Sequence, residues 1–411
     1  MAYEVVVKGG QVIDPARNTR ALLDVGIRAG KIEILAPDLS AAEGQRVIDA
    51  SGMIVTPGLI DIHTHVAEAI VPLAAAPDQV GVRAGVTTVC DAGSTGYANF
   101  AGLREYVIPQ AQTDVFCFLH LSPVGEAVIP ETGWRHVSAD QMLQVIDRNR
   151  NIIKGIKTRA TANTIAELGI DTVALAKRVA VDAGLPVMVH LGLDRGEALP
   201  AAELTAFTRR MLDLLERGDV LTHIFTGRPG GLIGLAGDVM PALRDAIERG
   251  VRLDVASAIG HLDFQVARQA LAQDILPTTL STDSTTFLLN APIPFGLTVL
   301  MSEFLALGLS LTQVIEMTTV NAARVLGQER SRGSLGVGMP ADLSLLEQLE
   351  GNFLFIDNRD GHTLFGQSLL VPRLTIKNGL AVEPSARSQG YAQWSQQAQT
   401  TLAQQTRETK P

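Results

Sequence analysis

The chain has 411 residues, of which 46% are hydrophobic, 19% charged and only 4% aromatic, and its formal net charge is −9 at pH 7. This length suits one large domain with a smaller one, and the apolar content excludes an intrinsically disordered chain. Because no Lys/Arg cluster stands out along this acidic sequence, we expect neither nucleic acid nor a membrane as a partner, whereas a small anionic substrate is compatible with one buried arginine.

Residues 1–56 are predicted to form a small β-module. The segments EVVVKGGQVID, DVGIRAGKIEIL and RVIDASGMIVTPG each place a glycine-containing turn between two short strands. The chain start lacks a basic region followed by an apolar stretch, and no run approaches ~20 consecutive apolar residues. We therefore expect no signal peptide, no membrane span and a cytoplasmic protein.

Residues 57–332 are predicted to form an α/β fold, a (β/α)8 barrel of the TIM type. Each strand after the first is preceded by a helix-like segment, and the eight strands are LIDIHTHV, VTTVCDAG, DVFCFLHL, IIKGIK, LPVMVHL, DVLTHIF, VRLDVAS and LPTTLSTD. The aliphatic bias of these segments is typical of parallel strands buried on both faces. Cys90 and Cys117 lie in two of them, and we expect both to be buried, reduced thiols.

The chain after the barrel returns to short strands. Residues 333–384 contain GSLGVGMPADLSLLE and LTIKNGLAVEP, which resemble the hairpins of the N-terminus. We expect these residues and 1–56 to form one β-sandwich domain. The Gln-rich tail, residues 385–411, is expected to be mobile or loosely docked.

Histidines and one acid fall at the ends of four predicted strands. His63 and His65 close the first strand, and their i, i+2 spacing points both imidazoles to the same side. His190, His223 and Asp283 close the fifth, sixth and eighth strands. Because active sites of such barrels lie at the carboxyl ends of the strands, this alignment indicates a metal site inside the barrel.

A lysine completes the candidate set. IIKGIKTR offers Lys154 and Lys157 at the fourth strand, and the i+3 offset puts them on opposite faces. A desolvated lysine amine can take up carbon dioxide, and the resulting carbamate is an anionic oxygen ligand able to bridge two ions. We choose Lys157 because it is nearer the carboxyl end of the strand.

These residues and their flanking phrases resemble the amidohydrolase superfamily in its binuclear, carboxylated-lysine branch. The phrases KGGQVIDP, VTPGLIDIHTH, GVTTVCDAGS, GIKTRA, THIFTG and GSLGVGMPADL resemble its deacetylase and dihydroorotase-like group, and the likeness extends to about residue 384. The resemblance implies two divalent ions. His63 and His65 would bind the first, His190 and His223 the second, with the carbamate of Lys157 between them. Zinc is the expected metal, and the ligand types also admit Mn, Co or Fe.

The resemblance also implies a mechanism. The two ions share a water and lower its pKa, and the resulting bridging hydroxide attacks an amide or ester carbonyl. Asp283 would touch the first ion, take the proton from the water as general base and return it to the leaving group as general acid.

Substrate contacts are less specific in the sequence. Arg159, two residues after Lys157, and Arg228, in FTGRPGG, are candidates for binding a substrate carboxylate. The loop at residues 121–138 is either a lid or a surface excursion. Two segments depart from the deacetylase pattern. In the first, an ungapped match puts Ser257 where those enzymes carry a histidine, and the nearest imidazole is that of His261. In the second, SerThrThrPhe follows Asp283 where those enzymes tend to carry glycine and histidine.

We expect a deacetylase-type hydrolase of a small acylated acid, an N-acyl amino acid or O-acyl hydroxy acid. The alternative is a cyclic amidase of the dihydroorotase or hydantoinase kind, which shares the ion pair. A catalytically dead scaffold would have lost metal ligands, and all six positions are present here. A nucleobase deaminase usually uses one metal and lacks the bridging lysine. A homo-oligomer is expected from the general prevalence of such assemblies.

Overall fold

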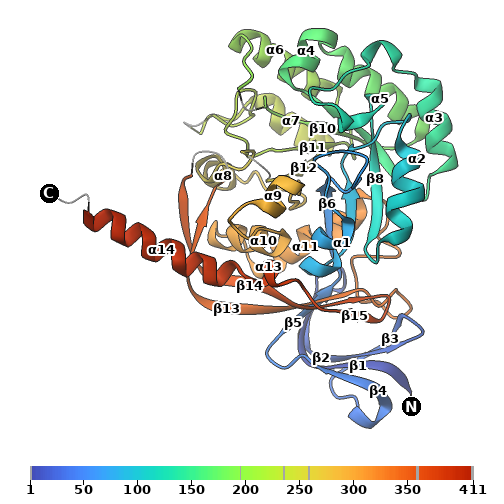
Figure 1. The fold of residues 1–411 in the computed structure, drawn as a ribbon, viewed down its shortest axis with the longest axis vertical. Helices are drawn as coiled ribbons and strands as arrows, with labels where there is room; N and C mark the ends of the chain where they lie inside the picture. Colours follow the sequence, from blue (N-terminus) through green and yellow to red (C-terminus); the bar gives the residue numbers. More distant parts are fainter. Residues whose placement is uncertain (1, 195, 235–236, 258–259, 358–360, 409–411) are drawn as a thin grey trace.

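The computed structural model describes residues 2–194, 196–234, 237–257, 260–357 and 361–408, in a mixed α/β arrangement (Figure 1). Two sheets organise it. One is a curled parallel sheet surrounded by helices, and the other, in the lower part of Figure 1, combines strands from both ends of the chain. Among the described residues, none of the helices has the length and apolar character needed to cross a bilayer.

The parallel sheet contains seven strands in sequence order. They are β6 (Leu59–Thr64), β7 (Val86–Asp91), β8 (Asp114–His120), β9 (Ile153–Arg159), β10 (Val187–His190), β11 (Val220–Thr222) and β12 (Arg252–Asp254). Every neighbouring pair is parallel, as expected for strands joined by helical crossovers. Cys90 and Cys117 are buried and unbridged in this sheet.

The predicted eighth strand is not a regular strand. Its segment makes only single bridges, Thr279 with Asp254 of β12 and Ser284 with Thr64 of β6. The backbone N–H of Asp283 donates to the carbonyl of His63 at 2.7 Å, so the segment still lies between the first and last strands. Asp283 has a positive φ of 53°, which breaks the extended conformation that a ladder requires.

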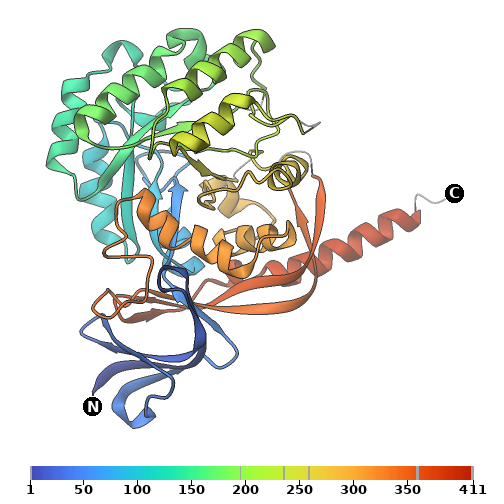
Figure 2. The same ribbon diagram turned by 180° about the vertical axis from the view of Figure 1, so that it is seen from behind.

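Helices cover the outside of the parallel sheet, whereas the lower end of the molecule is formed by strands (Figures 1 and 2). Ser138, Thr161 and Asp263 cap three of them by accepting hydrogen bonds from first-turn N–H groups. The helices up to residue 325 are α1 (Pro77–Val80), α2 (Phe100–Gly102), α3 (Ala139–Arg148), α4 (Ala162–Leu168), α5 (Asp171–Ala183), α6 (Ala201–Leu214), α7 (Pro241–Arg249), α8 (Phe264–Leu271), α9 (Thr286–Asn290), α10 (Leu297–Ala306), α11 (Leu311–Met317) and α12 (Val320–Val325).

The second sheet joins the two ends of the chain. Its strands are β1 (Tyr3–Asp14), β2 (Thr19–Arg28), β3 (Lys31–Ala36), β4 (Gly44–Asp49), β5 (Ile54–Pro57), β13 (Leu343–Ile356), β14 (Thr363–Lys377) and β15 (Leu380–Val382). β5 pairs antiparallel with β13, with Pro57 opposite Leu343. Apolar side chains from both ends share one core, including Val12, Val25, Leu345 and Ile376.

The C-terminal segment differs from the expected loose tail, because it forms α13 (Ala386–Gln389) and the long α14 (Tyr391–Glu408). Gln and Ala are good helix formers, which accounts for the conformation. Tyr391 is buried, stacks on Phe355 with ring centroids 5.5 Å apart, and donates a hydrogen bond to the Leu354 carbonyl. The first turns of α14 are therefore docked on β13, and the rest projects from the body (Figures 1 and 2).

Candidate metal centre

A pocket of about 210 Å³ opens at the carboxyl edge of the parallel sheet. It brings together most of the site residues expected from the sequence, along with several that were not. The lining residues are His63, His65, Leu73, Glu126, Ile129, Lys157, Arg159, His190, Asp194, Arg228, His261, Asp283, Thr285 and Phe287.

His63 and His65 are held by their Nδ1 atoms. His63 Nδ1 lies 2.9 Å from the hydroxyl of Thr222, and His65 Nδ1 lies 2.9 Å from the hydroxyl of Ser94. The Nε2 atoms face Asp283, whose Oδ1 is 3.5 Å from that of His63 and 3.0 Å from that of His65. A second hydrogen bond that fixes the ring is the usual support of a metal-binding histidine.

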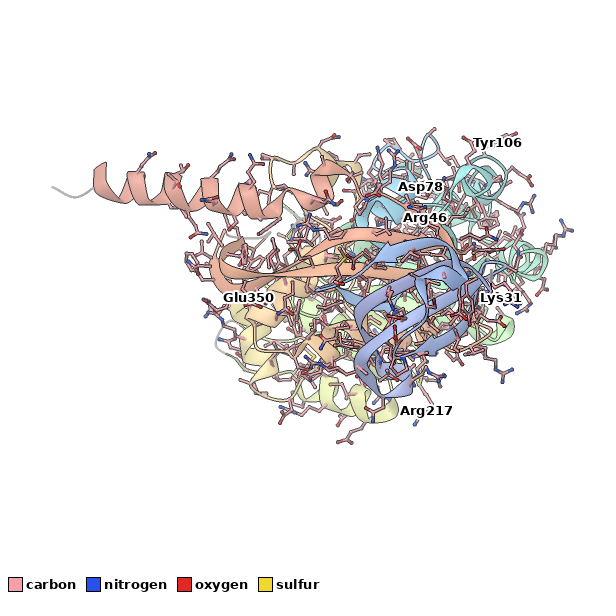
Figure 3. The ribbon with its side chains drawn as sticks, turned by 90° about the horizontal axis from the view of Figure 1, so that it is seen from below. Lys31, Arg46, Asp78, Tyr106, Arg217 and Glu350 are labelled. Atoms are coloured by element: carbon pink, nitrogen blue, oxygen red, sulfur yellow. The ribbon has the colours of Figure 1, made fainter. Side chains whose placement is uncertain are left out.

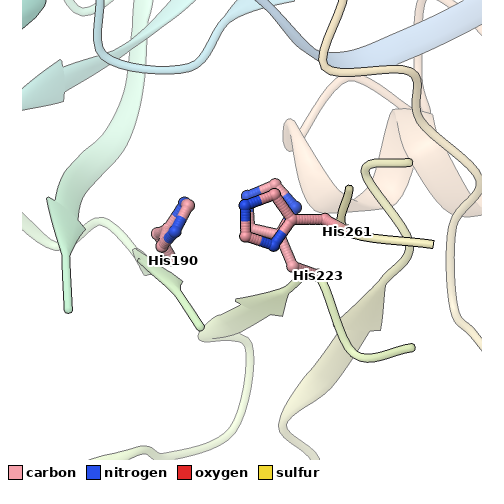
Figure 4. Close-up of side chains that lie close together, drawn as sticks. All are labelled: His190, His223 and His261. Carbon is pink, nitrogen blue, oxygen red and sulfur yellow. The ribbon is translucent and has the colours of Figure 1, made fainter. Parts of the chain in front are cut away.

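His190, His223 and His261 form a cluster of three imidazoles (Figure 4). The ring centroid of His223 is 4.3 Å from that of His190 and 4.2 Å from that of His261. His223 Nδ1 lies 2.7 Å from the Ala256 carbonyl, which can only accept, so Nδ1 carries the proton and Nε2 keeps its lone pair. That Nε2 is fully buried and has no hydrogen-bond partner.

Two of these site residues have a backbone conformation that side chains rarely adopt. His223 has a φ of 68° and Asp283 a φ of 53°. Left-handed conformations of non-glycine residues are uncommon and cost free energy, and they concentrate at functional sites. Here each turns the chain sharply at the end of a strand, which brings Asp283 into the pocket lining and His223 against His190 beside it.

The two lysines of β9 have different environments. Lys157 is 1% exposed, and its Nζ lies 3.0 Å from His63 Nε2. Burial lowers the pKa of Lys157 to about 8, although Glu126 and Asp283 act in the opposite direction. Lys154 lies outside the pocket, where its Nζ donates to the Arg150 carbonyl. Of the two, Lys157 therefore has the amine that is more readily neutral, which is the form that reacts with carbon dioxide.

The chemistry of these residues fits divalent metal ions. Burial lowers the pKa of His190 and of His223 well below the usual range, and neighbouring imidazoles add to the effect. Both rings are therefore neutral, the form that binds metals. Donor atoms of His63, His223 and Asp283 lie within 4.8 Å of one another, as do those of the three clustered imidazoles.

A polar network that the sequence did not predict lies beneath the pocket. Asp254 accepts hydrogen bonds from the hydroxyls of Thr222, Thr279 and Ser281. Burial raises the pKa of Asp254 to about 6, against the effect of these hydrogen bonds. Since Thr222 also contacts His63, the network connects β11, β12 and the irregular eighth segment to the first histidine. A lone Asp at a strand end carried no signal of this role.

Arg159 lines the pocket but is already ion-paired. Nη1 donates to Glu131 at 2.5 Å, Nη2 donates to both carboxylate oxygens of Asp194 at 3.0 and 2.9 Å, and Nε lies 3.9 Å from Glu126. Glu131 is 1% exposed at its side chain and Asp194 is 33% exposed. Arg228 also lines the pocket, and its guanidinium donates to the carbonyls of Gly260 and Leu193.

Both regions that depart from the deacetylase pattern contribute residues to the pocket wall. His261 supplies an imidazole there, and Ser257 is fully buried. Thr285 and Phe287 follow Asp283 into the lining. The loop at residues 121–138 contributes Glu126 and Ile129, so it forms part of the wall rather than a separate excursion.

Known proteins resemble this chain over most of its length. The sequence model of the amidohydrolase family matches residues 54–379. A deacetylase of Agrobacterium fabrum is 30% identical over 360 residues, which are 87% of this chain and 85% of that protein. A solved structure described as a dihydroorotase has a TM-score of 0.81 at 29% identity, covering 93% of this chain and 99% of its own. Another, described as an adenine deaminase, has a TM-score of 0.82 at 28% identity, covering 93% and 100%.

Proposed function

The chain belongs to the amidohydrolase family and is a hydrolase acting on C–N bonds, and we propose that it removes the acyl group from a small acylated acid through an amide or ester bond. Membership of the family confirms the resemblance expected from the sequence motifs. The observation that carries the proposal is the convergence of His63, His65, His190, His223 and Asp283 around Lys157 at the carboxyl edge of the sheet. The similarity to a protein named as a deacetylase supports the acyl substrate.

The proposed site holds two divalent ions, with zinc favoured by its nitrogen and carboxylate donors. His63 and His65 would hold one ion, His190 and His223 the other, and Lys157 as carbamate would lie between them. When bound, such ions lower the pKa of a water and polarise a substrate carbonyl. This arrangement is proposed together with a (β/α)8 barrel that the irregular segment carrying Asp283 closes between β12 and β6, and with a β-sandwich formed by residues 1–56 and 333–384.

Asp283 is proposed to move the proton. Its Oδ1 lies 3.0 Å from His65 Nε2 and 3.5 Å from His63 Nε2, so the carboxylate stands at the centre of the donor set. The carboxylate would accept a proton from the attacking water and pass it to the leaving nitrogen or oxygen as the bond breaks. The Thr222–Asp254 hydrogen bond holds His63 from behind and keeps its ring oriented.

Arg159 is proposed to bind the substrate carboxylate by exchange. Glu131 is deeply buried and would keep its ion pair, whereas Asp194 is partly exposed and lies in the pocket wall. A substrate carboxylate would replace Asp194 on Nη2 of Arg159 and make the same pair of hydrogen bonds. Arg228 is the second candidate contact.

A cyclic amidase is the second candidate function. The solved structure described as a dihydroorotase, at 29% identity and a TM-score of 0.81, favours it. Such a reaction uses the same donor set on a ring amide, so it differs only in the pocket wall. Assays of dihydroorotate ring opening and of acyl release on the same preparation would separate the two functions.

Metal content and acyl hydrolysis test the proposal together. The wild type, expressed with added zinc and bicarbonate, should contain about two ions per chain and release acetate from N-acetyl amino acids or O-acetyl hydroxy acids. Lys157→Ala should lose bound metal and activity, while Lys154→Ala, the matched control on the same strand, should keep both. Equal metal content in all three proteins would overturn the carbamate-bridged site.

A further inference from the structure

A second groove, of about 550 Å³, lies at the opposite edge of the parallel sheet, where the strands begin. Its wall includes the starts of β9 and β12, the end of α5 and the residues before β11. Six of its lining residues carry a positive charge: Arg150, Lys154, Lys177, Arg217, Arg252 and Arg324. Glu216 and Asp219 are the acids among the lining residues that the structure describes.

The cations come from separate parts of the sequence. Lys154, Lys177, Arg217, Arg252 and Arg324 belong to five different segments, and the chain as a whole has a net charge of −9. The sequence therefore contains no basic cluster, and the fold alone gathers these side chains. Figure 3 shows Arg217 at the edge of the molecule in the view from below.

Both acids of the groove are already used. Lys177 Nζ lies 2.6 Å from Asp219 and 3.2 Å from Glu216. Asp219 also accepts hydrogen bonds from the backbone N–H groups of Val187 and Glu216. Arg150 pairs with Asp147. Among the described residues, no carboxylate lies within ion-pair distance of the other four cations, which are Lys154, Arg217, Arg252 and Arg324.

Two of these cations are partly buried. Lys154 Nζ stands 5.1 Å from the Phe116 ring centroid, and Arg252 donates from Nη1 to the Arg324 carbonyl at 3.1 Å. Burial lowers the pKa of both groups, and the like charge of Arg332 adds to this at Lys154. At Arg252 the carboxylates of Glu329 and Asp219 act on the pKa in the opposite direction, while Arg324 adds to the lowering. Partly desolvated positive charges that lack a carboxylate at ion-pair distance cost free energy, which a bound anion would offset.

The ends of helices explain only part of this charge. Cations stabilise helix C-termini, and α5 ends at Ala183, whose carbonyl accepts from Arg150. Lys154 and Arg252, however, belong to strands and do not contact that helix end. They reach the ends of other helices instead, since Lys154 donates to the Arg150 carbonyl just past α3 and Arg252 donates to the Arg324 carbonyl in the last turn of α12. Each contact uses one N–H donor, and the remaining donors of both side chains are available to an anion.

We propose that this groove binds a small phosphorylated molecule, at a site separate from the metal centre. Arginine and lysine are the side chains that recognise phosphate oxygens through charge-assisted hydrogen bonds. A volume of about 550 Å³ lies in the range of small-molecule sites. Four cations without carboxylate partners match the charge of two phosphate groups. Free phosphate shares this chemistry, and a separate arm of the test covers it.

Calorimetric titration of the full-length, metal-loaded protein tests the proposal, with fructose 1,6-bisphosphate as the probe at constant ionic strength. Fructose is the matched ligand without charge, and inorganic phosphate tests for a free-ion site. Saturable binding of the bisphosphate, with no binding of fructose, is expected. Arg252→Gln and Lys154→Gln should each weaken binding about tenfold, as loss of one charge-assisted hydrogen bond predicts.

Two control variants and one substitute variant accompany the binding measurements. Arg209→Gln, at an exposed arginine of α6 outside the groove, should bind like the wild type. Arg217→Gln, at an exposed position, replaces Arg252→Gln if the latter does not fold. His190→Asn removes a proposed metal ligand and should leave bisphosphate binding intact. Absence of binding, equal binding by all groove variants, or loss of binding in His190→Asn would each overturn the proposal, and none of these readouts depends on hydrolytic activity.

Discussion

Asp194→Asn is expected to strengthen the binding of acidic substrates. Asp194 accepts two hydrogen bonds from Nη2 of Arg159, at 2.9 and 3.0 Å, and so occupies the position proposed for a substrate carboxylate. Asparagine has the same shape but no charge, and it competes more weakly for the guanidinium. Glu131, on the other side of Arg159, stays in place and keeps the arginine aimed at the pocket.

The size of the effect follows from the exposure of the pair. The side chain of Asp194 is 33% exposed and that of Arg159 is 9% exposed. Exposed ion pairs contribute about 0.2–1 kcal/mol, and a two-bond contact with a buried guanidinium lies at the upper end of that range. A gain of about 1 kcal/mol corresponds to a KM about fivefold lower for an acidic substrate. Breaking the buried Glu131 pair with Glu131→Gln should instead cost about 3–5 kcal/mol of stability.

Steady-state kinetics on two matched substrates measures this effect. The KM of Asp194→Asn should fall for an acetylated carboxylic acid and stay unchanged for its methyl ester, with similar kcat for both. Glu197→Gln is the control, since Glu197 accepts one hydrogen bond from the backbone N–H of Asp194, and no hydrogen bond or ion pair joins the described side chains of Glu197 and Arg159. A KM for the acid that is unchanged or higher in Asp194→Asn would refute the exchange of carboxylates on Arg159.

Three further predictions concern other parts of the molecule. In Gly93→Ala the new Cβ would lie 2.6 Å from Lys157 Cγ at a φ of +98°, so metal content by elemental analysis should fall. Burial raises the pKa of Asp114, but Lys377 and Arg332 outweigh this effect and hold the pKa of the folded protein below the ordinary 3.8. The ion pairs of Asp114 therefore stabilise the fold fully above pH 3.8, and this stabilisation is lost as the pH falls through the pKa of Asp114 in the folded protein. Asp114→Asn should therefore lower stability at pH 7 by about 1–3 kcal/mol in urea melts, with a smaller difference near pH 3. Tyr391→Ala should lose about 3 kcal/mol of packing and expose α14 to proteolysis, with kcat/KM unchanged.

Spacing within a strand was the most informative signal in the sequence. The i, i+2 pair of His63 and His65 follows from periodicity, because alternate residues share one side of a strand. His190 and His223 were found from their positions at the ends of apolar, strand-like segments. The structure brings these side chains together at one pocket with Lys157.

The partners of the candidate residues could not be read from the sequence. Glu131 and Asp194 reach Arg159 from loops 28 and 35 residues away in the sequence, and no local pattern marks such contacts. The left-handed backbone of Asp283 interrupts what the alternation of LPTTLSTD predicts as a strand. The C-terminal helix was missed for another reason: its polar composition resembles that of a mobile tail, and its docking rests on a few side chains, Tyr391, Ser395 and Gln399, that contact β13.

The shared sheet of the two chain ends has a consequence for synthesis. The hydroxyl of Thr56 contacts the carbonyl of Ser344, and the two residues are 288 positions apart. At a translation rate of about 5–20 residues per second, roughly 15–60 s pass between the emergence of β5 and that of its partner β13. During this time the free edge of β5 is open to pairing with other chains. Contacts between such distant residues also form slowly. The sheet of the N-terminal strands is therefore complete only after the residues between β5 and β13 have been synthesised.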